Sequence, residues 1–160
     1  AKEQFIYSQH HVLGGVSPES CSRVIQFYND FSLCVSKSFV TMTPQEASFV
    51  KYAINSYLGM KVTFFNQLHD AALDFGCSPQ RIINGVSADK RIGYSHTRVP
   101  GFDGKKGFGG ACLPKDMNAF VKFNQDLTLI AESVKINNKM REEYELDERE
   151  KDNNIKFGEK

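Results

Sequence analysis

The stretch from Gly107 to Asp116, with the sequence GFGGACLPKD, holds the residues of this chain that are best suited to chemistry. Its three glycines within four residues leave a backbone that can adopt positive φ and approach a ligand closely. Cys112 follows soon after them, and Pro114 stands where the first turn of a helix tolerates a missing N–H. A cysteine at the N-terminus of a helix, close to a lysine, lies where a thiolate is favoured. The pattern indicates a nucleophilic thiol or, alternatively, a packed cysteine at a glycine-rich turn.

Two further segments accompany this stretch along the chain. Residues 46–67 read EASFVKYAINSYLGMKVTFFNQ, and residues 89–93 read DKRIG. In this order the three segments resemble the nucleotide-sugar dehydrogenases, the family that includes UDP-glucose 6-dehydrogenase and GDP-mannose dehydrogenase. They match the central helix of that family, a short motif after it, and the segment that carries the catalytic cysteine. Ala111 departs from a commoner serine, and residues 94–106 are longer than in many members.

The resemblance implies a set of catalytic residues. Cys112 would be the covalent nucleophile, and Asp116 would position or activate a water molecule. Lys51 and Asn55 would donate hydrogen bonds to the oxyanion that forms at C6 of the sugar. Their i, i+4 spacing places them side by side on a helix, where a solvated surface patch is the alternative interpretation. Lys115 would contact the cofactor or the substrate while favouring the thiolate.

The resemblance also implies substrate-binding residues. Arg91 would reach the substrate of a neighbouring subunit, and an exposed structural arginine is the alternative. Phe108 and Gly109 would contact the substrate from the glycine-rich segment. No CxxC or Cys/His spacing in the sequence is typical of a metal site, so no metal is expected.

The reaction implied by the resemblance oxidises a sugar nucleotide, most simply UDP-glucose to UDP-glucuronate, with two molecules of NAD. A thiohemiacetal and then a thioester would form on Cys112. GDP-mannose is an alternative substrate, and a dimerisation module without catalytic activity is an alternative function. The 3-hydroxyacid dehydrogenases share a helix with Lys and Asn at this spacing but lack the GFGG-Cys signature.

A long helix must position these residues. Thr43-Pro44-Gln45-Glu46 is a capping box with proline at the first helical position, and Gly76 ends the run. Apolar residues recur every three or four positions along it, at Val50, Ala53, Tyr57, Met60, Phe64, Leu68, Ala71 and Phe75. Such a stripe predicts a helix that packs against a partner, and the resemblance implies a homodimer through residues 44–75. A long core helix in a monomer is the alternative.

The first 42 residues predict strands at Phe5–Tyr7, Val12–Leu13 and Ser38–Met42, with a helix that begins near Pro18. The resemblance makes these the last strands and helix of a Rossmann-like domain. No GxGxxG follows a strand, so the phosphate cradle for NAD is missing, and we expect a fragment or a truncated member. The expected fold class is thus α+β and mainly helical, with a long central helix in a dimerisation-type helical domain.

The remaining chain predicts shorter elements. A helix begins near Pro79, a loop at 96–106 is a candidate substrate-facing lid, and two helices follow Cys112 on either side of a break at 124–126. From residue 139 onward 14 of 22 residues are charged, which predicts a solvated helix end and tail. We therefore expect domains at 1–42, 43–145 and 146–160.

Composition narrows the class of protein. The chain has 160 residues and a net charge of +1, which gives no electrostatic case for nucleic acid or an anionic membrane as partner. No apolar run reaches the length of a membrane-spanning helix. The four scattered cysteines favour a reduced cytoplasmic protein, in which Cys21, Cys34 and Cys77 are expected to be packing residues.

Overall fold

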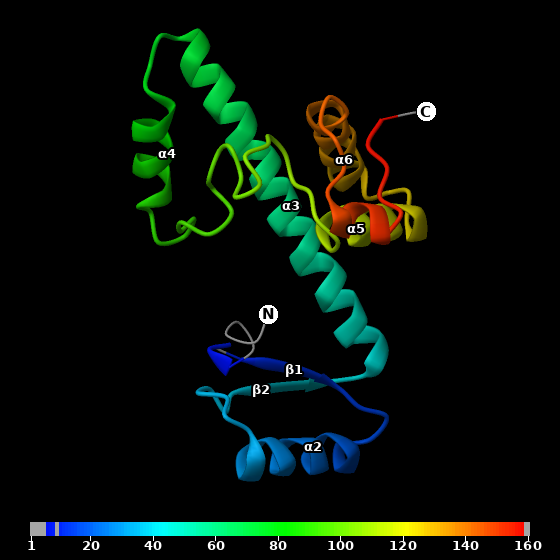
Figure 1. Cartoon of the computed structure of the whole chain (residues 1–160). Coiled ribbons are helices and arrows are strands. Elements are labelled where there is room, and N and C mark those ends of the chain that lie inside the picture. Colours follow the sequence, from blue (N-terminus) through cyan, green and yellow to red (C-terminus); the bar gives the residue numbers. More distant parts are fainter. Residues whose placement is uncertain (1–5, 9, 159–160) are drawn as a thin grey trace. The chain divides into compact units, whose positions relative to one another are not determined.

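The computed structural model describes residues 6–8 and 10–158 of the chain. These residues form two compact units, Ala1–Lys51 and Tyr52–Lys160. The helix α3 (Pro44–Asp74) contributes residues to both units (Figure 1). The fold is mainly helical with a small parallel sheet and one long helix, as the sequence predicts.

The first unit is a strand–helix–strand arrangement. The strand β1 (His11–Gly14) pairs in parallel with β2 (Phe39–Met42), with His11 opposite Phe39. The helix α2 (Pro18–Phe31) connects them and starts at a capping box on Ser17. The buried His11 ring lies 5.4 Å from the Tyr28 ring of α2 and 5.3 Å from the Phe39 ring of β2, measured between centroids. The helix is thus anchored to the strands by aromatic packing.

The strand predicted at Phe5–Tyr7 is wrong for the residues that the structure describes. Ile6 is helical and Tyr7 lies in a turn, while Phe5 lies outside the described residues. The carbonyl of Ile6 accepts one hydrogen bond, of 2.9 Å, from the N–H of Val35. A short apolar run is therefore not sufficient for a strand here, because a single bond to a loop does not make a ladder.

The predicted start and end of α3 are confirmed. The N–H of Thr43 donates to Oε2 of Glu46 at 2.8 Å, and the N–H of Glu46 donates to Oγ1 of Thr43 at 3.3 Å. Gly76 follows the helix with φ of +67°, a left-handed conformation that suits glycine at a helix end. The long helix is thus specified by local signals at both ends.

One face of α3 that packs inside the second unit is small and polar. Its buried positions recur at helical spacing and are Ser56, Gly59, Thr63 and Asn66, whereas the buried Phe65 packs against Ile83 of α4. A Cβ on Gly59 would overlap the buried Sδ of Met117, so this face lets the next helix approach closely. Of the large side chains in the predicted apolar stripe, Met60 and Leu68 pack against the core, whereas Tyr57 is 59% and Phe64 54% exposed.

Four shorter helices complete the second unit, namely α4 (Pro79–Ser87), α5 (Leu113–Phe123), α6 (Thr128–Arg141) and α7 (Glu148–Asp152). One apolar cluster joins the glycine-rich segment to α5 and α6 through Phe108, Met117, Phe120, Ile130 and Val134. A second cluster joins α3 to α4 through Phe65, Ile83 and Val99. No helix in the described ranges is long and apolar enough to cross a membrane.

The solvated tail predicted from residue 139 onward is wrong for three of its residues, although most of the segment is exposed or half-buried. Arg141, Glu150 and Ile155 are each at least nine-tenths buried, and α7 lies within this segment. The number of charged residues is a poor guide to exposure here, because Arg141 and Glu150 form an ion pair of 2.6 Å inside the fold.

Two of the three cysteines that were predicted to be packing residues are buried, and the third is exposed. Cys21 and Cys34 are buried, as expected of packing residues. Cys77 is exposed, so the prediction of a packing role for it is wrong. It lies in the loop that leaves α3 after Gly76.

Candidate active site

Cys112 stands at the beginning of α5. It is the N-cap residue of this helix, its side chain is exposed, and Pro114 occupies the first turn as the sequence predicts. The carbonyl of Cys112 accepts the N–H of Asp116 at 2.9 Å, which closes the first helical turn. The thiol is therefore accessible and lies at the positive end of the helix dipole.

Asp116 is a buried carboxylate with a donor on each oxygen. Its Oδ1 accepts Nζ of Lys115 at 2.7 Å, and its Oδ2 accepts Nδ2 of Asn55 at 2.6 Å. The residue is 0% exposed, so these donors replace the water that the carboxylate gives up. The pair with Asn55 joins α3 to the helix that begins at Cys112.

Lys115 keeps its positive charge beside this thiol. The hydrogen bond that it donates to Asp116 raises the pKa of its ammonium group, and partial burial opposes the rise. The negative charges that Asp116, Cys112 and Tyr52 can carry raise the pKa of Lys115 further. Lys115 thus places a positive charge close to the Cys112 thiol.

The glycine-rich segment is held by two buried asparagines. Gly107 and Gly110 have φ of +75° and +76°, as the three-glycine pattern predicts. The N–H of Gly107 donates to Oδ1 of Asn66 at 3.1 Å. The side chain of Asn137 accepts the N–H of Phe108 at 2.6 Å and donates to its carbonyl at 3.0 Å. These bonds fix the backbone before the cysteine.

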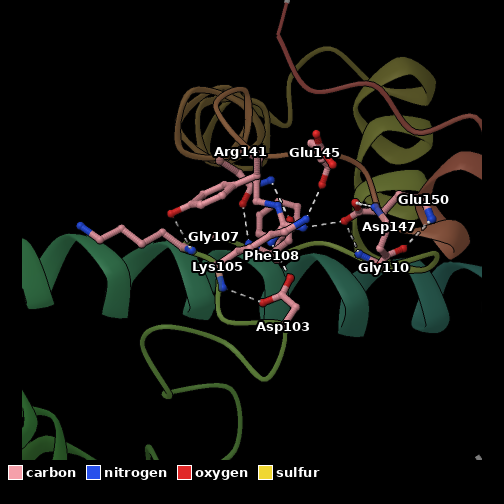
Figure 2. A network of polar contacts seen from close by, with 12 residues as sticks. Asp103, Lys105, Gly107, Phe108, Gly110, Arg141, Glu145, Asp147 and Glu150 are labelled. Atoms are coloured by element: carbon pink, nitrogen blue, oxygen red, sulfur yellow. Dashed lines mark hydrogen bonds and ion pairs between the residues drawn. The ribbon is translucent and has the colours of Figure 1, made fainter.

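A buried ion-pair network supports the same segment from the other side (Figure 2). Nη1 of Arg141 lies 2.7 Å from Oδ2 of Asp103, and Nη2 lies 2.6 Å from Oε1 of Glu150. The same Oε1 accepts the N–H of Gly110 at 2.9 Å. A Cβ on Gly109 would overlap both Arg141 and Glu150, so this glycine makes room for the protein's own ion pair.

The sequence analysis did not identify these supporting residues, although a signal was present. Asn137 and Arg141 continue the helical spacing of Ile130 and Val134, so two polar residues occupy core positions of α6. A polar residue at a core position indicates a buried partner. The missed partner of Arg141, Glu150, lies in the segment that its charge density had assigned to solvent.

The predicted catalytic residues are partly brought together. Cys112, Lys115, Asp116 and Asn55 form one connected group, as described above. Lys51 precedes Asn55 by one turn of α3, and its side chain is exposed.

The predicted substrate-binding residues lie in different settings. Arg91 is 88% exposed in its side chain and pairs with Asp89 at 2.6 Å. The hydrogen bond from Arg91 lowers the pKa of Asp89. The ring of Phe108 is in the core, and Gly109 packs against Arg141. Both therefore serve the packing of this segment, and a substrate contact by either residue stays a prediction.

The loop at 96–106 is fastened to the body of the second unit. Nζ of Lys106 pairs with Asp70 of α3, and Nζ of Lys105 donates to the carbonyl of Glu145. Thr97 is buried within the loop. These contacts tie the loop to the rest of its own unit. Among the described residues no group of three or more His, Cys, Asp or Glu is placed to hold a metal ion.

The fold and the site together define a helical central domain of the kind found in nucleotide-sugar dehydrogenases. Residues 45–140 match the UDP-glucose/GDP-mannose dehydrogenase family, central domain, and the chain belongs to this family.

Similar proteins agree with this assignment. UDP-glucose 6-dehydrogenase of Rickettsia prowazekii (strain Madrid E) is 31% identical over 144 residues, which are 88% of this chain and 32% of that protein. The UDP-glucose 6-dehydrogenase of Rhizobium meliloti (strain 1021) is 34% identical over 102 residues, 61% of this chain and 22% of that protein. The structure of a UDP-glucose dehydrogenase from Pyrobaculum islandicum superposes with a TM-score of 0.70 at 31% identity, over 88% of this chain and 31% of that chain. The chain thus spans about a third or less of the length of these relatives.

Proposed function

We propose that this chain supplies the nucleophilic cysteine of an NAD-dependent oxidation of a sugar nucleotide, of the UDP-glucose to UDP-glucuronate type. The observation that carries this proposal is the exposed Cys112 at the start of α5, beside the connected group of Lys115, Asp116 and Asn55. A single-step alcohol oxidation has no need of a thiol, whereas oxidation to a carboxylate through an enzyme-bound thioester does.

The thiol would act at the aldehyde stage. Sγ of Cys112 forms a bond to the aldehyde carbon, and the carbonyl oxygen becomes the oxyanion of a thiohemiacetal. Loss of hydride from that carbon leaves a thioester, and water then cleaves the carbon–sulfur bond to give the carboxylate and the free thiol. NAD, when bound, takes up the two hydrides that the two oxidation steps release.

Amide and ammonium donors would stabilise the oxyanion. Asp116 accepts one proton of the Asn55 amide and thereby fixes the orientation of the group, whose second proton stays available to a substrate oxygen. Lys51, one turn earlier on α3, would supply a second donor, because donors placed before charge develops stabilise the transition state most. Asp116 would also orient Lys115 and a hydrolytic water beside Cys112.

The described residues do not fit the pyrophosphate of NAD. Among the described residues, the only paired glycines at the end of a strand are Gly14, the last residue of β1, and Gly15, which begins the turn to α2. A Cβ on Gly15 would overlap Ser20 and Cys21, and one on Gly14 would overlap Ala47, so protein atoms already fill this turn. We therefore expect the 160-residue chain by itself to bind NAD too weakly for turnover.

A homodimer through residues 44–75 is the second part of the proposal. The exposed Tyr57 and Phe64 of α3 line a hollow of about 450 Å³ together with Leu129 and Ile136 of α6. A second copy of the stripe would cover this apolar surface. Such a dimer would also bring Arg91, exposed here, to a neighbouring subunit.

A dimerisation module without catalytic activity is the second candidate function. The exposed stripe of α3 favours it, because self-association needs none of the residues around Cys112. Turnover separates the two candidates, since only the catalytic function requires the thiol.

The test joins this chain to the NAD-binding part of a relative and supplies UDP-glucose and NAD. We expect NADH and a sugar carboxylate from the parent, and loss of carboxylate in Cys112→Ser, because the hydroxyl does not form the thioester readily. Cys77→Ser is the matched control, since it removes another exposed thiol. Lys51→Ala should slow turnover by roughly a hundredfold, as for one lost oxyanion donor. Full carboxylate formation by Cys112→Ser would refute the covalent mechanism.

A further inference from the structure

We propose that Glu150 is a positioning residue for the Cys112 thiol. Through the N–H of Gly110, its carboxylate would hold the segment that delivers the thiol to the start of α5. This inference rests on the proposed function for its catalytic meaning, but the contacts that carry it are independent of any reaction.

Both carboxylate oxygens of Glu150 accept hydrogen bonds, and the residue is 0% exposed. Oε1 accepts the N–H of Gly110 at 2.9 Å and Nη2 of Arg141 at 2.6 Å. Oε2 accepts the N–H of Asp147 at 2.9 Å, and Oδ1 of Asp147 accepts the N–H of Glu150 at 2.8 Å. The capping box of the short helix α7 therefore fixes the carboxylate that reaches the glycine-rich segment (Figure 2).

Arg141 makes this carboxylate rigid. Its guanidinium is 1% exposed and bridges Glu150 to Asp103, so that it connects α7 to the loop at 96–106. The Tyr144 and Phe157 rings lie 5.9 and 5.2 Å from the guanidinium carbon. A buried charge that loses its partner is costly, so the position of Glu150 is strongly determined.

The position of the thiol lies between two anchors. Gly110 is tied to Glu150, and the carbonyl of Cys112 is tied to the N–H of Asp116. Only Ala111 separates the two anchored residues. A side chain at Gly109 would overlap Arg141 and Glu150, so the backbone of the glycine-rich segment packs directly against this ion pair. Release of the first anchor would let the cysteine leave the helix N-terminus.

This support comes from outside the segment that defines the family match. The match ends at residue 140, and both Arg141 and Glu150 lie beyond it. The C-terminal segment of the chain thus has a part in shaping the site that the matched region alone does not provide.

The test measures how fast iodoacetamide alkylates Cys112 in the 160-residue chain at neutral pH, with the exposed Cys77 as internal reference. Glu150→Asp keeps the charge for Arg141 but is one methylene too short to reach Gly110 as well. We expect it to slow alkylation of Cys112 relative to Cys77 by about fivefold, since reactivity follows the thiolate fraction and the thiol leaves the helix N-terminus and Lys115. Glu150→Ala should slow it at least as much.

Two further variants separate positioning from general stability. Glu150→Gln keeps both the length and an oxygen acceptor for Gly110, so it should restore the parent rate to within about twofold, as for a retained neutral hydrogen bond. Glu148→Asp makes the same shortening at an exposed position of α7 and should leave the rate unchanged. A parent-like rate in Glu150→Asp, or an equal loss in Glu148→Asp, would overturn the proposal.

Turnover of the chain joined to an NAD-binding part gives the second readout. Glu150→Asp should lower kcat while KM for the sugar nucleotide stays near the parent value, because the thiol is misplaced but the substrate contacts are intact. A change in KM alone would overturn the positioning role. If the parent itself shows no turnover while the alkylation rates behave as expected, the proposed function fails and the positioning of Cys112 stands.

Discussion

Asn55 and Asp116 lie 61 residues apart and are joined by a hydrogen bond of 2.6 Å, in which the amide of α3 donates to a carboxylate that is 0% exposed. This contact connects the long helix to the helix that begins at Cys112. Because Lys115 binds the other oxygen, removal of Asn55 takes the amide donor away from Oδ2 of a buried carboxylate. The first prediction tests how much the hydrogen bond between Asn55 and Asp116 contributes to stability.

Asn55→Ala should lower the free energy of unfolding by roughly 1–3 kcal/mol, the usual cost of removing one partner of a buried hydrogen bond to a charged group. Urea unfolding followed by circular dichroism measures the difference. Gln125→Ala truncates an amide on the exposed turn between α5 and α6 and should change the same quantity by no more than about 0.5 kcal/mol. Equal effects of the two substitutions would contradict a structural role for the bond between Asn55 and Asp116.

The four thiols should react with iodoacetamide in a defined order. Cys112 and Cys77 are exposed, whereas Cys21 and Cys34 are buried. Of the two exposed thiols, Cys112 should react several-fold faster, since it lies at a helix N-terminus beside a cationic lysine. Mass mapping of peptides during a time course at neutral pH gives the rates. A rate for Cys112 no higher than that for Cys77 would count against a nucleophilic thiol.

The exposed stripe of α3 should produce a dimer. Light scattering at micromolar concentration should report about twice the chain mass of 18.1 kDa. The interface should bury roughly 2,000 Å² or more, as obligate interfaces do. Phe64→Glu should give a monomer, because an unpaired charge would enter the interface. Phe123→Glu introduces the same charge at an exposed position near the end of α5 and should leave the dimer intact. A monomeric parent would refute the homodimer and the reach of Arg91 across subunits.

The ion pair of Asp103 should make stability depend on pH in acid. Burial raises the pKa of Asp103. The hydrogen bond and charge of Arg141 and the N–H of Lys105 together lower this pKa by more, so it lies below its ordinary value of 3.8. The folded state then binds fewer protons than the unfolded state. The resulting stabilisation is complete above the ordinary pKa and is lost as pH falls through the lower folded value.

Urea unfolding between pH 6 and pH 3 tests this dependence. Asp103→Asn should be less stable than the parent at pH 6, because the buried Arg141 loses one charged partner. The difference between the two proteins should shrink as pH falls below about 4, where the parent carboxylate is protonated in the unfolded state. A difference that stays constant across this range would show that Asp103 contributes no pH-dependent stability.

Local signals in the sequence were sufficient for most elements and for the position of Cys112 at the start of a helix. The capping box at Thr43, the positive φ of Gly107 and Gly110 and the helix start at Cys112 depend on neighbours within a few residues, so they can be predicted without the fold. The strand predicted at Phe5–Tyr7 failed in its described part because strand formation also needs a partner.

Only the tertiary structure decided what surrounds the thiol. Glu150 lies 40 residues beyond Gly110, and Asn55 lies 61 residues before Asp116, so both pairings depend on how the helices pack. The sequence by itself determined that a cysteine stands after three glycines at the head of a helix. The charged C-terminal segment was assigned to solvent because charge normally favours water. Arg141 and Glu150 of this segment are buried here because they neutralise one another at 2.6 Å, a distance that no pattern along the chain encodes.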